Sequence, residues 1–259
     1  MKKILLAIVA CLFLAGCNTG ANGENGFESP LSQDIGENGL GIYTQTKELK
    51  SDSPEMQPPA GCPTGAEIDP RLKTNMSFDG SMRLLTDDRF AAATFSQTIN
   101  SITPESVASR FQILQTRGLG TTIQAGQTFD STCTKNANGW GCESSGNVNL
   151  PPEHMKYQNC GIQNATSWDS KYGMGTYKTA SGAQYNVIYT KWTTNGNVVC
   201  RDTGVDMGPG TSTYISIETP DMITPTFRFQ CRAGVSLYTR LEASGKVLLT
   251  QQHQTGFRN

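Results

Sequence analysis

The chain has 259 residues and a formal net charge of −1, with only 17% of its residues charged. This balance excludes the strongly basic surface with which nucleic-acid-binding proteins neutralise phosphates, so no nucleic-acid partner is expected. The length allows a large β domain, and the many Gly, Thr, Asn, Gln and Ser residues are typical of a turn-rich, exported β protein.

The N-terminal segment has the features of a secretory signal. Lys2 and Lys3 precede an apolar run over residues 4–14, and the tetrapeptide Leu14-Ala15-Gly16-Cys17 closes it. A cationic start, a short apolar stretch and small residues before a break are typical of such signals. The run is too short for a permanent membrane span, which needs about 20 residues.

The tetrapeptide resembles the lipobox of bacterial lipoproteins. The resemblance implies cleavage before Cys17, a thioether-linked diacylglycerol on Cys17 and an acyl group such as palmitate on the new N-terminus. Several acyl chains make a lasting membrane anchor. Asn18 follows the lipidated cysteine, and in enteric bacteria an Asp there favours the inner membrane, so the resemblance favours the outer membrane. The alternative is an ordinary secretory signal with an incidental cysteine.

Residues 17–61 are expected to form the lipidated cysteine and a flexible tether. The segment is rich in Gly, Asn, Glu, Ser and Pro, and its only aromatic residues are Phe27 and Tyr43. Such a composition cannot bury enough apolar surface to fold. As a coil it would hold the domain about 35–40 Å from the lipid, which is enough to clear the headgroups or to reach peptidoglycan or another envelope protein.

Six cysteines follow the lipobox, and we expect them to form three disulfides. An even number of cysteines in an oxidising compartment favours bridges. The first expected pair is Cys133–Cys142, whose intervening Asn138-Gly139 step can reverse the chain. The second is Cys200–Cys231, which would join two strands. The full set is Cys62, Cys133, Cys142, Cys160, Cys200 and Cys231.

Residues 62–259 are expected to form one domain, in which residues 62–117 are partly helical. Asp87 and Asp88 can begin a helix through Phe95. Thr103-Pro104-Glu105 can begin a second helix, with proline at its first position. The apolar residues that follow also fit a strand over residues 111–114.

Residues 118–259 are expected to form antiparallel strands in a sandwich or a barrel-like fold, because apolar and polar residues alternate. The clearest unit runs from Tyr185 to Cys200, where Asn195-Gly196 predicts a type I′ hairpin turn with Trp192 opposite Val199. Residues 227–232 and 235–242 predict two more strands. Ala243-Ser244-Gly245 then turns the chain into a last strand near Leu248, which we expect either at a sheet edge or as a strand that ends in a tail.

The candidate catalytic residues are few. Asp202-Thr203-Gly204 matches the aspartic-protease tripeptide but occurs once, and it also fits a plain turn. Glu153 and His154 lie in a loop-like stretch, and no nucleophile motif accompanies His154 or His253. No C-x-x-C spacing or other ligand cluster suggests a metal, and nothing calls for a cofactor.

Two groups of side chains are candidate ligand-binding residues. If they are exposed, Trp140 and Trp168 can stack on sugar rings, whereas Trp192 is expected in the core. The second group lies on the solvated face of neighbouring strands, where guanidinium groups can bind carboxylate or phosphate. That group is Arg228, Arg232, Tyr238 and Arg240.

The sequence therefore predicts a lipid-anchored envelope lipoprotein that acts as a binding or structural module, with glycan, peptidoglycan or an envelope protein as its partner. One alternative is an envelope hydrolase that uses Asp202, Glu153 or His154. The other is an assembly factor that pairs with a client through the edge strand near Leu248.

Overall fold

The computed structural model describes residues 42–57, 60, 68–86, 89–137, 139–145, 151, 154–178, 182–221 and 233–256. These residues form eleven strands in one antiparallel sheet, which confirms the mainly β fold. They include the 3-10 turn Pro54–Met56, and none of their helices could cross a membrane. The strands are β1 Ile42–Leu49, β2 Ser77–Thr86, β3 Arg89–Thr103, β4 Ser106–Arg117, β5 Thr128–Asn136, β6 Gly139–Ser145, β7 Cys160–Lys178, β8 Gln184–Cys200, β9 Val205–Thr219, β10 Ala233–Ala243 and β11 Lys246–Thr255.

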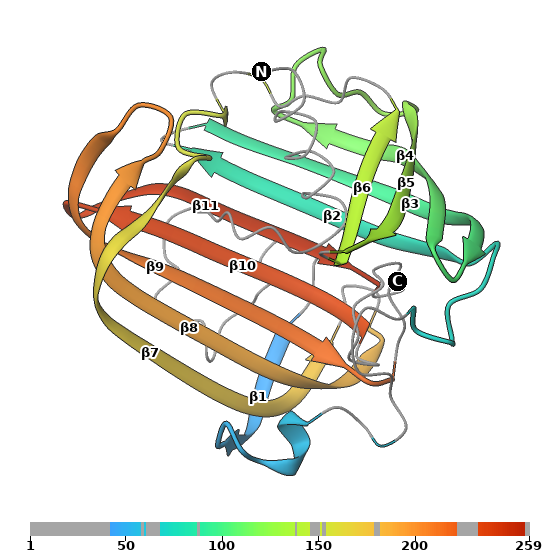
Figure 1. Ribbon diagram of the computed structural model, residues 1–259, viewed down its shortest axis with the longest axis horizontal. Coiled ribbons are helices and arrows are strands. Elements are labelled where there is room, and N and C mark those ends of the chain that lie inside the picture. The colour runs from blue at the N-terminus through green and yellow to red at the C-terminus, as the bar shows by residue number, and fades with distance from the viewer. Residues whose placement is uncertain are drawn as a thin grey trace.

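The sheet consists of two meanders joined side by side. Its strand order is β1-β7-β8-β9-β10-β11-β2-β3-β4-β5-β6, so the last strand, β11, pairs with β2 in the middle of the sheet. Figure 1 shows that the sheet is strongly coiled: β6 crosses in front of β2 and β3, and β1 crosses behind the long strands β7–β9. The sheet therefore curls around one of its faces, which we call the inner face.

The inner face carries the larger apolar core. Phe95, Phe111 and Phe129 lie on β3, β4 and β5, and the rings of Phe111 and Phe129 stack 4.8 Å apart. The same cluster includes Val198 of β8 and Leu241 of β10. Residues from both halves of the sheet thus pack together, and this contact maintains the curl.

The opposite, outer face of the sheet carries a second, tyrosine-rich cluster on strands β1 and β7–β10. Tyr43 of β1 is fully buried, and its ring stacks on that of Tyr189 at 5.0 Å. Burial raises the pKa of both phenols above their ordinary value. The expectation of a flexible tether up to residue 61 therefore does not hold for residues 42–49, which form β1, because Tyr43 gains this aromatic contact. The full cluster is Tyr43, Tyr177, Val187, Tyr189, Ile215, Ile217 and Tyr238.

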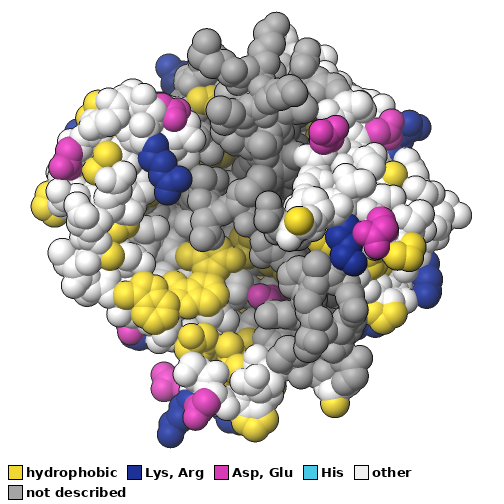
Figure 2. Space-filling model, viewed as in Figure 1, with side chains coloured by type: hydrophobic (Ala, Val, Ile, Leu, Met, Phe, Trp, Pro, Cys, Tyr) yellow, Lys and Arg dark blue, Asp and Glu magenta, His cyan; other side chains and the backbone are white. Residues whose placement is uncertain are grey.

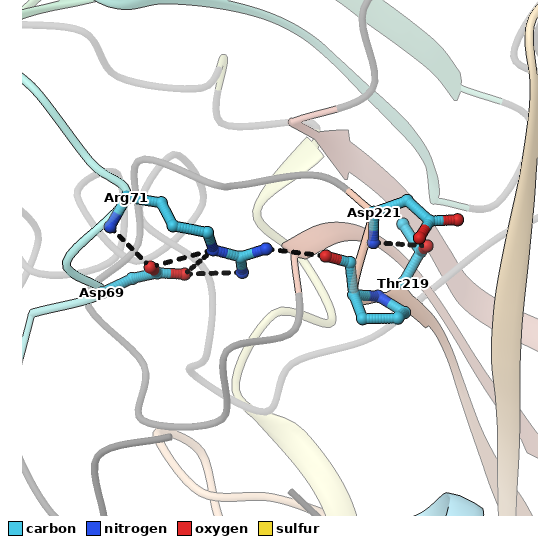
Figure 3. Close-up of polar contacts among 5 residues, drawn as sticks. Asp69, Arg71, Thr219 and Asp221 are labelled. Atoms are coloured by element: carbon cyan, nitrogen blue, oxygen red, sulfur yellow. Dashed lines mark hydrogen bonds and ion pairs between the residues drawn. The ribbon is translucent and has the colours of Figure 1, made fainter. Parts of the chain in front are cut away.

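A hydrogen bond from Arg71, which is also ion-paired with Asp69, ties the segment before β2 to the end of β9 (Figure 3). The Arg71 guanidinium donates to the buried Asp69 carboxylate at 2.7 Å and to the Pro220 carbonyl at 2.6 Å. Burial alone would raise the pKa of Asp69, but hydrogen bonds from the Arg71 side chain and backbone outweigh it and lower that pKa. Segments far apart in the sequence are thereby held together at one end of the sheet.

The two short helices expected within residues 62–117 are wrong where the structure describes them. Residues 89–95 begin β3, and Thr103-Pro104-Glu105 lies at the turn between β3 and β4. Ala91, Ala93 and Phe95 are buried in alternation, as a strand with one core-facing side requires. Pairing on both sides outweighs the local preference for a helix.

The type I′ turn expected at Asn195-Gly196 is also wrong, because β8 runs straight through it. The Asn195 amide donates to the Ser167 hydroxyl at 2.8 Å and accepts from the Thr211 hydroxyl at 2.6 Å, which links it to both neighbouring strands. A Cβ on Gly196 would lie 2.9 Å from the Gln163 carbonyl oxygen. The glycine therefore permits close approach of a neighbouring strand rather than a turn.

The structure confirms one expected disulfide and corrects the other. Cys133 and Cys142 are bonded across the β5–β6 pair. Cys200 bonds to Cys160 on the adjacent strand β7 and not to Cys231, because Cys160 lies directly opposite it. Cys62 and Cys231 lie outside the described residues, so the third expected bridge stays a prediction.

The C-terminal hairpin confirms the expected turn and corrects the expected edge. Ser244 and Gly245 both have positive φ, at 50° and 76°, as a two-residue turn between antiparallel strands requires. Leu248 does not lie at a sheet edge, because β11 pairs with β10 on one side and with β2 on the other. The assembly-factor hypothesis therefore loses the edge strand on which it depended.

We predict that Gly175→Ala weakens the attachment of β1. A Cβ at this position of β7 would lie 2.0 Å from the Thr44 carbonyl oxygen and 2.5 Å from Cε2 of Tyr43. Such overpacking should lower the free energy of unfolding by about 1–3 kcal/mol in urea titrations. Gly161→Ala, also on β7, is the matched control because no atom lies within 4 Å of its Cβ. Equal stability of the two variants would contradict this account of β1.

We predict that His253 makes the fold sensitive to acid. Its ring stacks on Phe95, neither ring nitrogen has a hydrogen-bond partner among the described residues, and burial lowers its pKa to about 4. The pKa of histidine in the unfolded chain is about 6.5. Between about pH 4 and this value the unfolded chain binds a proton that the folded chain does not, so the free energy of unfolding falls as the pH falls. The loss should reach about 2–3 kcal/mol between pH 7 and pH 4.5.

The measurement is the unfolding free energy at several pH values for the native chain and for His253→Asn. The variant keeps the carboxylates that also lose stability in acid, among them Asp69 and Asp130. Only the difference between the two profiles therefore reports on His253. Parallel profiles would show that this imidazole does not contribute.

Candidate functional site

A cleft of about 570 Å³ lies on the inner face, over strands β7 to β11. Figure 2 shows apolar side chains gathered over this half of the sheet on the face toward the viewer. The described lining residues combine aromatic rings, aliphatic side chains, hydroxyls and one guanidinium. They are Cys160, Gly161, Ile162, Trp168, Trp192, Thr194, Arg201, Ser212, Tyr214, Thr239, Leu241 and Leu249.

The register of the strands arranges most of these residues in two adjacent rows, because directly opposed residues point to the same face. The first row crosses five strands as Trp168, Thr194, Ser212, Leu241 and Leu249. The second row crosses three strands as Trp192, Tyr214 and Thr239. The floor of the cleft is therefore built on paired strands rather than on loops.

The aromatic side chains lie together at one end of these rows. The Trp192 and Tyr214 rings are 5.0 Å apart and tilted by 35°. Trp168 lies diagonally across from Trp192 and is 62% exposed, the largest exposed fraction among the large apolar residues described. A bulge in β7 immediately precedes it, where Asn164 has a φ of 49° and the register shifts between Gln163 and Ser167. Bulges commonly redirect a side chain in this way.

The polar groups of the cleft are available to a ligand. Within the described part of the chain, the hydroxyls of Thr194, Ser212 and Thr239 make no side-chain hydrogen bond. The Arg201 side chain is exposed and makes no ion pair with any described residue. No carboxylate is among the described lining residues. The site therefore offers neutral hydroxyls and one positive charge.

The opposite face of the same strands carries two lysines. Lys171 and Lys191 lie directly opposite each other on β7 and β8. Burial lowers the pKa of Lys191, and the neighbouring charge of Lys171 lowers it further, while Asp169 partly offsets the shift. These groups do not line the cleft, because residues adjacent in a strand point to opposite faces.

The three tryptophans have different positions in the structure. Trp168 lies in the cleft, but on strand β7 rather than in a loop. Trp140 lies on β6, is half-buried and packs against the inner core. Trp192, which we expected in the core opposite Val199, instead lies opposite Tyr214 and lines the cleft. The expected hairpin turn placed Trp192 opposite Val199, so its position in the cleft could not be predicted from the sequence.

The candidate catalytic residues do not meet in this cleft. Asp202 is exposed in the turn after β8, and Asn159 Nδ2 donates to its carboxylate. His154 is buried and its Nε2 donates to the Gly118 carbonyl at 3.1 Å. Glu153 lies outside the described residues. No group of three His, Cys, Asp or Glu side chains suited to a metal occurs in the described ranges.

The structure describes only some of the residues of the expected arginine-rich face. Arg228 and Arg232 lie outside the described residues. Tyr238 is not on a solvated face, because it is buried in the outer tyrosine cluster. Arg240 pairs with Glu242 of its own strand. These two residues point away from the cleft, whose β10 residues are Thr239 and Leu241.

The lipobox is the part of the chain that resembles known proteins. Residues 1–18, outside the described ranges, match the family described as the prokaryotic membrane lipoprotein lipid attachment site. The chain matches no curated protein and no solved structure. The protein is therefore a lipoprotein, anchored by lipid to a membrane of a prokaryotic cell envelope.

Proposed function

We propose that the domain is a glycan-binding module that its lipid anchor at Cys17 holds at the outer membrane. The observation that carries this proposal is the exposed ring of Trp168 beside the Trp192–Tyr214 pair. A large exposed aromatic side chain on a rigid strand is costly to leave in water and is typical of a binding surface. Such rings pack against the C–H groups of a sugar face.

The hydroxyls beside the rings support a sugar over a purely apolar ligand. Thr194 and Ser212 are adjacent in the first row, and Thr239 is adjacent to Tyr214 in the second. A ligand with many hydroxyls can exchange hydrogen bonds with these groups, whereas an acyl chain would leave them unpaired at a cost of about 1–3 kcal/mol each. A lining of apolar surface with a few convergent polar groups is typical of small-molecule and oligosaccharide sites.

The binding test uses the mature lipoprotein in detergent micelles and a panel of neutral oligosaccharides, measured by titration calorimetry. We predict that Trp168→Ala weakens glycan binding at least about 10-fold, because truncating a central aromatic contact commonly costs about 2 kcal/mol. Leu114→Ala is the matched control, because Leu114 is 45% exposed and lies on β4 outside the cleft. Absence of binding across the panel, or equal affinities of the two variants, would contradict the proposal.

The outer-membrane location is supported by Asn18, since the resemblance assigns inner-membrane retention to Asp at this position. We predict that the native chain, expressed in an enteric bacterium, fractionates with outer membranes on a density gradient. Asn18→Asp should move it to the inner-membrane fraction, and Asn18→Ser should leave it in place. Recovery of the native chain with inner membranes would overturn the location without affecting glycan binding.

A further inference from the structure

We infer that the cleft selects sugar chains that bear an anionic group, a carboxylate or a phosphate, and that Arg201 recognises this group. The inference rests on the proposed glycan binding and adds to it the charge and the length of the ligand. It follows from the single charge among the described lining residues, from the attachment of the turn that carries Arg201, and from the distance between this turn and the aromatic rings.

Arg201 is the one charged side chain among the described lining residues of the cleft. Its guanidinium forms no ion pair with any residue in the described ranges, unlike those of Arg71, Arg110 and Arg240. A guanidinium presents a planar fork of donors that matches the two oxygens of a carboxylate or a phosphate. An anionic ligand group therefore has a partner here that no described carboxylate occupies.

The turn that carries Arg201 is fixed from two directions. The preceding residue, Cys200, is bonded to Cys160, and the Arg201 backbone N–H donates to the Asn159 carbonyl at 3.0 Å. The Asn159 side-chain amide also donates to the carboxylate of Asp202. The carboxylate of Asp202 is thus bound by Asn159. The backbone of Arg201 is already positioned before a ligand arrives, and this reduces the entropic cost of binding.

The distance from Arg201 to the aromatic rings sets the length of the ligand. Trp168 lies opposite Thr194, whereas Arg201 follows Cys200 at the end of β8. At about 3.3 Å per residue, the six residue steps from Thr194 to Cys200 span at most about 20 Å. A separation of this order favours an oligosaccharide, with one ring against Trp168 and its anionic group near Arg201.

The experiment compares three probes by calorimetry with the mature lipoprotein in detergent micelles. They are an oligogalacturonide, its carboxyl-reduced neutral counterpart, and the same neutral chain bearing a terminal phosphate. We expect at least one anionic probe to bind at least 10-fold more tightly than the neutral chain, with an advantage that shrinks at high salt. Arg201→Gln should abolish this advantage. Arg89→Gln, which removes another exposed positive charge, on β3, should leave the advantage intact.

Each outcome separates the two proposals. Equal affinities of the native chain for all three probes, or an advantage that persists in Arg201→Gln, would overturn the role of Arg201 and leave glycan binding standing. Equal losses in the Arg201→Gln and Arg89→Gln variants would also overturn it, because they would report a general effect of charge. If none of the three probes binds, the glycan proposal and this inference both fail. An advantage of one anionic probe alone would support the inference and identify the group as carboxylate or as phosphate.

Discussion

The rest of the structure depends on one packing constraint: the inner face of a single continuous sheet has to be buried largely against itself. Among the described residues no helix covers this face, so the sheet coils until β2–β6 meet the ends of β8, β10 and β11. The core that results unites Phe111 and Cys133 with Val198 and Leu241. Apolar burial is the dominant favourable term in folding, and here it dictates the curvature.

The cleft begins where this self-burial ends. Leu241 and Leu249 belong to the inner core and also line the cleft, and Ile162 packs against the same core. Farther along β8 and β9 the inner positions change to Trp192, Thr194 and Ser212. A surface continuous with the core keeps its shape without a ligand, so binding costs little ordering of the protein. The change from aliphatic to aromatic and hydroxyl side chains marks the boundary between the part of the face that stabilises the fold and the part that can bind.

Alternation in the sequence predicted the strand content of the C-terminal half and the turn at Ser244-Gly245, because both are local. It failed where a neighbour from far along the chain decides the outcome. Asn195-Gly196 is a strong local turn signal, yet hydrogen bonds to Ser167 and Thr211 from two other strands keep it extended. The strand near Leu248 was expected at an edge because the strand that pairs with it, β2, precedes it by more than 150 residues.

The candidate site was predictable only where a side chain stands out by its chemistry. Trp168 is a candidate from the sequence because an exposed indole can stack on a sugar ring, and its position in the cleft agrees with that interpretation. Trp192, Tyr214 and Arg201 were missed, because their convergence depends on the β7–β8–β9 register and on the Cys160–Cys200 bridge. A shift of one residue in that register would turn Trp192 to the opposite face.

The lipid anchor lowers the affinity that the cleft needs for a ligand in the same layer of the envelope. Residues 18–41 separate the lipidated cysteine from β1, and a chain of this length spans at most about 80 Å. A domain confined to that distance from the membrane meets a glycan in the same layer at an effective concentration on the order of 1 mM. Under the proposed glycan-binding function, a dissociation constant below that concentration would keep the open cleft occupied most of the time at the envelope. Rapid release and rebinding along a polymer would then be compatible with permanent residence, because the anchor would supply the residence and the cleft the selectivity.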